Sequence, residues 1–111
     1  MPKFVILLSD KNKELFTETL LNEHVEHLQR LKDSEILRLC GPFKDNMSAI
    51  QIISADTLSE AKAIIQRDPF VKSNYYESVE IRELIEATPE NNWLMSHPQT
   101  EEKRKNNKTN K

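Results

Sequence analysis

The order of apolar segments along the chain constrains its fold more than any other feature of the sequence. Short, nearly continuous apolar runs of strand length alternate with longer stretches in which apolar residues recur every three or four positions. The first pattern predicts buried strands and the second predicts amphipathic helices. Polar residues between the segments supply turns and helix caps, among them Asn12 before the first helix and a capping box from Thr57 to Glu60 before the second. We therefore expect strands at residues 3–8, 36–43, 47–54 and 75–85, and helices at residues 13–34 and 58–68.

The resulting order, β-α-β-β-α-β, predicts a ferredoxin-like α+β fold in which two helices cover one face of a four-stranded antiparallel sheet. Within the strands, apolar residues occupy consecutive positions, as in Val5 to Leu8, so both faces of the sheet look apolar. The two helices cover only one face, and monomers rarely expose an apolar surface of that size. We therefore expect a homodimer in which two sheets pack face to face.

The 111 residues suffice for one small domain, which we place at residues 1–88, followed by a polar and largely disordered tail at residues 89–111. Residues 101–111 carry five basic and two acidic side chains, so the remainder holds a net charge of −5 out of a total of −2. An acidic body argues against nucleic acid as a specific partner.

The sequence also indicates where the protein works. No apolar run approaches the roughly 20 residues that span a bilayer, so we expect no membrane partner. The apolar run at residues 4–8 is too short for the core of a signal peptide. A single cysteine, Cys40, excludes an internal disulfide and favours a cytoplasmic location.

Two residues 44 positions apart are the first candidates for a functional site. His24 lies in the middle of the apolar stripe of the first helix, where a surface histidine is out of place, and Asp68 follows the second helix in the sequence Asp-Pro-Phe. The predicted topology puts both on the same side of the sheet. A carboxylate that holds an imidazole ring is an acid/base dyad. Two other interpretations stay open: His24 is a neutral core histidine, or Asp68 only closes the end turn of its helix.

The same residues carry a family resemblance. The first half of the chain shows His24 followed by Leu28 and Leu31, and then Ile36-Leu37 with Gly41-Pro42. The second half shows Ser59-Glu60-Ala61, then Asp68-Pro69-Phe70, then Tyr76, Ser78-Val79 and Ile81. Over residues 3–85 this pattern resembles the YciI-like (YCII-related) proteins of the dimeric α+β barrel superfamily. The resemblance implies a dimeric ferredoxin-like fold with His24 and Asp68 paired in a pocket beside the sheet, and it implies possible enzymatic activity.

One position departs from the family pattern. The family often places glycine before the second strand, and this chain has Glu35 there. Because glycine suits the left-handed residue that ends a helix and glutamate does not, we expect a different helix end, with Asp33 or Ser34 sharing the turn.

Five further residues bear on the site. Phe43, Phe70 and Tyr76 are candidate substrate-binding residues that would line an apolar pocket, although aromatic residues at such positions often belong to the core. His27 is expected to be an exposed helix residue, because no further His/Cys cluster makes it a metal ligand. Cys40 is expected to be a small buried strand residue. The sequence contains no metal motif and no nucleotide or other cofactor signature.

The dyad predicts cofactor-free proton transfer of the lyase or isomerase type on a small molecule, with His24 and Asp68 as the catalytic residues. Two alternatives come from other classes. A non-catalytic small-molecule-binding or regulatory module uses the same fold. An RNA-binding domain of this fold needs exposed aromatic residues on its central strands, where this chain offers only Phe4.

Overall fold

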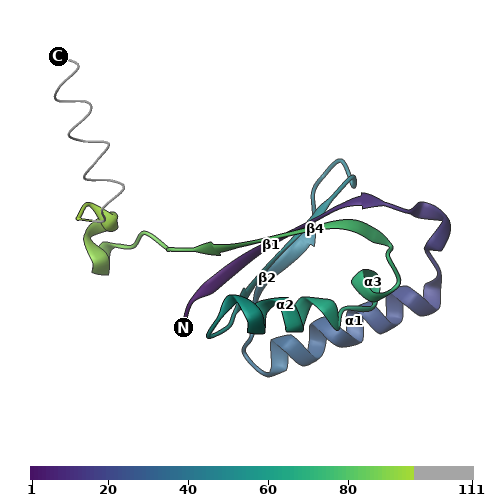
Figure 1. Ribbon diagram of the computed structural model, residues 1–111, viewed down its shortest axis with the longest axis horizontal. Coiled ribbons are helices and arrows are strands. Elements are labelled where there is room, and N and C mark those ends of the chain that lie inside the picture. The colour runs from purple at the N-terminus through teal and green to yellow at the C-terminus, as the bar shows by residue number, and fades with distance from the viewer. Residues whose placement is uncertain (97–111) are drawn as a thin grey trace, which may run out of the picture.

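The computed structural model describes residues 1–96 and shows one four-stranded antiparallel sheet with its helices on one face (Figure 1). The strands are ordered β2-β3-β1-β4 across the sheet, which confirms the predicted ferredoxin-like α+β fold. No helix in residues 1–96 is long and apolar enough to cross a membrane. The elements, in chain order, are β1 (Lys3–Lys11), the 3-10 helix η1 (Lys13–Leu15), α1 (Glu18–Asp33), β2 (Leu37–Pro42), β3 (Ala49–Ser54), α2 (Leu58–Gln66), α3 (Pro69–Lys72), β4 (Tyr76–Leu84) and the 3-10 helix η2 (Pro89–Leu94).

Alternation along β1 divides the two faces of the sheet. Phe4, Ile6 and Leu8 are almost fully buried beneath the helices, whereas Val5 and Leu7 between them are partly exposed. In the register with β3, Phe4 lies opposite Ile53 and Ile6 opposite Gln51, so these partners share the helix-covered face. Val5 lies opposite Ile52 on the other face, which no described helix covers (Figure 1).

The first helix begins later than the sequence predicts. A 3-10 turn occupies residues 13–15, the chain then extends through Phe16, and Thr17 caps α1 by accepting a hydrogen bond from the Leu20 amide at 3.0 Å. The uninterrupted run of good helix formers conceals this break, because propensity alone does not separate a cap from a helix interior. Asn12, one of the residues that the sequence offers as an N-cap, makes no side-chain cap.

The second helix ends at Gln66, and Asp68 has a role that the sequence reading missed. Its side chain caps a separate short helix, α3, with Pro69 at the first helical position, where a missing amide hydrogen costs nothing. The predicted capping box of α2 is formed in part: Thr57 accepts from the Glu60 amide, while the Glu60 carboxylate accepts from the Asp56 amide at 3.2 Å.

The end of α1 differs from our expectation at Glu35. Glu35 itself adopts the left-handed conformation, with φ of 61°. Its amide donates to the Lys32 carbonyl at 3.0 Å and the Ile36 amide donates to the Leu31 carbonyl at 2.9 Å. These two bonds form a Schellman motif, so the helix ends as it would with glycine.

Beyond β4 the chain leaves the sheet, and η2 lies apart from it in Figure 1. Of the predicted tail at residues 89–111, Pro89–Leu94 thus has local 3-10 structure, and residues 97–111 lie outside the described part of the chain. The division into a domain and a disordered tail stays a prediction.

Candidate functional site

His24 and Asp68, which the sequence predicts as a pair, are in direct contact. His24 Nδ1 lies 2.8 Å from Asp68 Oδ1. α1 carries the histidine, and the turn between α2 and α3 carries the aspartate. α1 and α3 are neighbours on the helix-covered face of the sheet, so the crossing of these two helices brings the pair together.

Three donors surround the fully buried carboxylate of Asp68. Besides His24, the Phe70 amide donates to Oδ1 at 2.9 Å and Gln51 Nε2 donates to Oδ2 at 2.9 Å. The hydrogen bond from the Phe70 amide follows from the N-cap position of Asp68, and Gln51 reaches the carboxylate from β3. The helix cap and the strand therefore fix the carboxylate before any ligand arrives.

Opposing effects act on the pKa of Asp68. Burial tends to raise this pKa, but the hydrogen bond and charge of His24, with the bonds from Gln51 and the Phe70 amide, bring the pKa below its usual value. Asp68 is therefore ionised near neutral pH and acts only as an acceptor. His24 Nδ1 consequently carries a hydrogen and donates it to Asp68, which leaves Nε2 as the ring nitrogen with a free lone pair.

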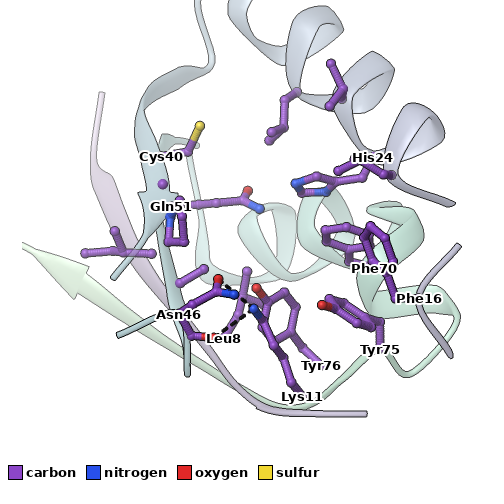
Figure 2. A pocket seen from close by; sticks show the side chains of 17 residues that line it. Leu8, Lys11, Phe16, His24, Cys40, Asn46, Gln51, Phe70, Tyr75 and Tyr76 are labelled. Atoms are coloured by element: carbon purple, nitrogen blue, oxygen red, sulfur yellow. Dashed lines mark hydrogen bonds between the residues drawn. The ribbon is translucent and has the colours of Figure 1, made fainter. Parts of the chain in front are cut away.

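The His24 ring stacks on Phe70, with centroids 3.9 Å apart and planes at 12°. Its side chain is 13% exposed, so the ring is held in place and remains accessible. The ring lies at the edge of a pocket on the helix side of the sheet (Figure 2), and the volume of this pocket is about 390 Å³. This volume is typical of a site for a small organic molecule.

The pocket wall is mainly aromatic and aliphatic. Phe70 and Tyr75 pack with centroids 4.6 Å apart, Tyr75 and Tyr76 at 5.1 Å, and Phe16 joins them at 5.9 Å from Tyr75. Burial raises the pKa of Tyr76 to about 12, with smaller contributions from the charges of Tyr75 and Asp68. Tyr76 therefore keeps its hydroxyl hydrogen and is available as a donor.

Of the three predicted substrate-binding residues, Phe70 and Tyr76 line this pocket and Phe43 does not. Phe43 follows β2 in the loop to β3, is 43% exposed, and lies by a shallower hollow together with Leu7 and Ser78. Leu7 belongs to the face of the sheet away from the helices, so Phe43 lies apart from the pocket of His24. The sequence predicts Phe43 as the last residue of a strand at residues 36–43, but β2 ends at Pro42, so the alternation of the strand does not assign Phe43 to a face.

Two expectations for neighbouring residues were wrong. His27 is buried, with 5% of its surface exposed, because it continues the buried stripe of α1 toward Leu31. Cys40 is exposed and lines the pocket, and it lies opposite Gln51 in the sheet. Within residues 1–96, no group of three or more His, Cys, Asp or Glu side chains is placed to hold a metal ion.

Gln51, Lys11 and Tyr75 belong to the site but were missed. Gln51 is a polar residue among the isoleucines of its strand, and this pattern predicts that its buried side chain has a hydrogen-bond partner. Lys11 and Tyr75 lie at strand ends, where the sequence gives no indication of direction. Lys11 belongs to a strand that we ended at Leu8.

The fold and this site define a class: small α+β proteins with a ferredoxin-like sheet and a hydrogen-bonded His–Asp pair in an apolar pocket beneath the helices. The chain belongs to the YCII-related domain family, whose model matches residues 2–85. It is 34% identical over 70 residues to the uncharacterized protein YjpA of Bacillus subtilis (strain 168), covering 63% of this chain and 82% of YjpA.

A solved structure shares the fold. It is that of the 5-chloro-2-hydroxyhydroquinone dehydrochlorinase TftG from Burkholderia phenoliruptrix AC1100, in complex with 2,5-dihydroxybenzoquinone. The match has a TM-score of 0.59 and 17% sequence identity, and it covers 79% of this chain and 97% of TftG.

Proposed function

We propose that this protein is a lyase- or isomerase-type enzyme that transfers protons on a small molecule without a cofactor. The observation that carries the proposal is the 2.8 Å contact between His24 and the buried carboxylate of Asp68, at the edge of a pocket that admits a ligand. A histidine held in this way is a general acid/base.

In the proposed reaction, His24 Nε2 takes a proton from a carbon next to a carbonyl, or from a phenol. The electrons of the broken bond move into the substrate as an enolate or phenolate. Asp68 stabilises the positive ring that forms and stays ionised itself. The protonated ring then returns the proton to another carbon, which completes an isomerisation, or to a leaving group that departs with its electron pair, which completes an elimination.

The structural comparison supports the lyase type. A dehydrochlorinase eliminates hydrogen chloride, and TftG was solved with a hydroxylated ring compound. At 17% identity the likeness shows the fold alone, so the reaction of this chain rests on its own His24–Asp68 geometry.

A proton-transfer assay tests the proposal directly. A panel of small carbonyl compounds, phenols and halogenated hydroxylated rings is incubated with the protein in deuterated water. NMR follows deuterium exchange at carbon and the disappearance of each compound. His24→Gln is expected to slow the reaction of any accepted compound by about 10²- to 10⁴-fold. Asp68→Asn is expected to slow it as well, because the ring loses its fixed tautomer.

The control is Glu26→Gln, an exposed position on the same helix, which should react at the rate of the natural protein. Circular dichroism confirms that each variant folds. Equal rates for the natural protein and His24→Gln would remove His24 from catalysis. Binding of a compound without exchange or turnover would favour the alternative, a non-catalytic binding module.

We also propose that two copies pack through the sheet face that the helices leave bare. The partly exposed Val5, Leu7 and Ile52 and the 54% exposed Leu39 support this assignment. The free thiol of Cys40 favours a reducing compartment, for which we propose the cytoplasm.

A further inference from the structure

Lys11 places a fixed positive charge at the pocket. It is the last residue of β1 and follows Asp10, whose φ of 58° interrupts the alternation of the strand. Lys11 and its β4 partner Tyr76 consequently both line the pocket on the helix side. Lys11 Nζ donates to the carbonyl oxygen and to Oδ1 of Asn46, each at 2.8 Å (Figure 2).

The ammonium group of Lys11 can donate one more hydrogen bond. It has three hydrogens, and two are engaged by Asn46. No carboxylate among residues 1–96 forms an ion pair with Lys11, and none of the side chains that line the pocket is acidic. The remaining hydrogen is available to a ligand. Nζ also lies 5.9 Å from the ring centroid of Tyr75 and 6.0 Å from that of Tyr76, so the charge is next to the aromatic wall.

Lys11 is therefore the positive charge that a ligand meets in this pocket. The dyad contributes a carboxylate and a ring that becomes positive only when protonated, so the pair is never more positive than neutral. The ammonium of Lys11 is the remaining full charge among the lining side chains. In an apolar pocket such a charge favours an anionic group on the ligand, because charge-assisted hydrogen bonds are about twice as strong as neutral ones.

The walls restrict the shape of that ligand. Figure 2 shows His24 and Lys11 on different sides of the pocket, with the rings of Phe70 and Tyr76 between them. Flat aromatic side chains favour a flat ligand that stacks or packs edge to face. The volume of about 390 Å³ suits a substituted single ring.

We propose that Lys11 is a specificity-determining residue that binds the anionic oxygen of a single-ring phenolate or enolate, with Asn46 holding its ammonium in place. The inference rests on the proposed function in taking this pocket as the ligand site, and it names the substrate class. When the ligand is a carbonyl compound, its neutral oxygen beside Lys11 becomes the enolate oxygen as His24 removes a proton from the adjacent carbon, and the ammonium group stabilises the negative charge that forms there.

Two matched probes test the charge requirement. 4-Nitrophenol is used at a pH where it is ionised, and 4-nitroanisole has the same ring with a methyl ether that cannot ionise. Calorimetric titration measures the dissociation constant of each probe for the natural protein, Lys11→Met and Lys62→Met. Met keeps the length and apolar stem of lysine, and Lys62 is an exposed lysine of α2 outside the pocket.

Lys11→Met is expected to weaken nitrophenolate binding by about 10- to 100-fold and to change nitroanisole binding by less than about twofold. Lys62→Met should bind both probes as the natural protein does. Equal nitrophenolate binding by Lys11→Met and the natural protein would overturn the inference. So would an equal loss for both probes, which would reduce Lys11 to packing, or no nitrophenolate binding by the natural protein.

The outcome is separable from that of the proposed function. Probe binding at equilibrium reports on Lys11 and needs no proton transfer, whereas the deuterium-exchange rates of His24→Gln report on the dyad. If His24→Gln retains the natural rate while Lys11→Met loses nitrophenolate, the acid/base proposal fails and the anion site stands.

Discussion

His24 and His27 lie one turn apart on α1, and their surroundings give them different chemistry. His24 has a carboxylate at Nδ1 and an opening to the pocket. His27 is buried, and its Nε2 has no hydrogen-bond partner in the described part of the chain. Burial lowers the pKa of His27, and the charges of Arg30 and His24 add to this, although Asp68 opposes it. His27 thus remains neutral at pH values at which an exposed histidine takes up a proton.

The buried His27 is expected to make the fold sensitive to mild acid. Its pKa is lower in the folded protein than the value of 6.5 expected when unfolded. Below pH 6.5 the unfolded chain therefore binds a proton that the folded one refuses, and the free energy of unfolding falls as the pH falls through this window. The slope from one group is at most about 1.4 kcal/mol per pH unit. The substitution His27→Leu removes this pH-dependent loss of stability, and it also removes a buried nitrogen without a hydrogen-bond partner.

Urea unfolding at pH 7.5 and pH 5.5 measures the difference. The stability of His27→Leu should decline less between these pH values than that of the natural protein. At pH 7.5 it should match or exceed the natural protein by about 1 kcal/mol. Asn22→Leu, at an exposed position of the same helix, should decline as the natural protein does. Parallel declines in the natural protein and His27→Leu would contradict the assignment.

For single residues, the sequence predicted which side chains pair more reliably than it predicted which side chains are buried. The pairing of His24 with Asp68 follows from two positions of a recognisable pattern. The burial of His27 and the exposure of Cys40 depend on how the helices and strands pack together, and the residue pattern within one element does not report this. Gln51 was open to prediction, because a polar residue in a buried strand needs a partner.

At the scale of elements, the end of α1 stores strain at one residue. Glu35 adopts a left-handed conformation that costs a residue with a side chain about 1 kcal/mol and costs glycine almost nothing. Glu35→Gly is expected to raise the free energy of unfolding by about 1 kcal/mol, measured by urea unfolding at pH 7.5. Ser34→Gly is the matched control: Ser34 has an ordinary φ of −86°, so glycine there should lower stability. A loss of stability in Glu35→Gly would show that the glutamate side chain makes a compensating contribution.

The order of the elements was predictable and their ends were not. The spacing of apolar residues and the length of each apolar run distinguish strands from helices, so the order β-α-β-β-α-β follows from the sequence. The break before Thr17 and the short helix after Asp68 depend on which side chain binds a free amide, and several residues nearby offer the same chemistry. For Asp68 this difference matters to the candidate site, since the cap that begins α3 also aims the carboxylate at His24.

At the scale of the whole molecule, the helices and the pocket occupy one face of the sheet and leave the other without a described covering (Figure 1). That bare face includes Leu39, Val5 and Ile52. Because the pocket lies on the opposite face, substitutions on the bare face test assembly without entering the site.

A lysine on the bare face is expected to separate the two copies of the proposed dimer. In Ile52→Lys, each copy brings a charge into the apolar contact, and burying unpaired charges there costs several kcal/mol. Sedimentation in dilute solution should give two chains for the natural protein and one for Ile52→Lys. Ala63→Lys, at an exposed position of α2 on the helix side, should remain a dimer.

Circular dichroism shows whether the Ile52→Lys monomer retains its fold, and nitrophenolate binding shows whether its pocket is intact. A natural protein that sediments as a single chain, or an Ile52→Lys variant that remains a dimer, would contradict sheet-to-sheet assembly.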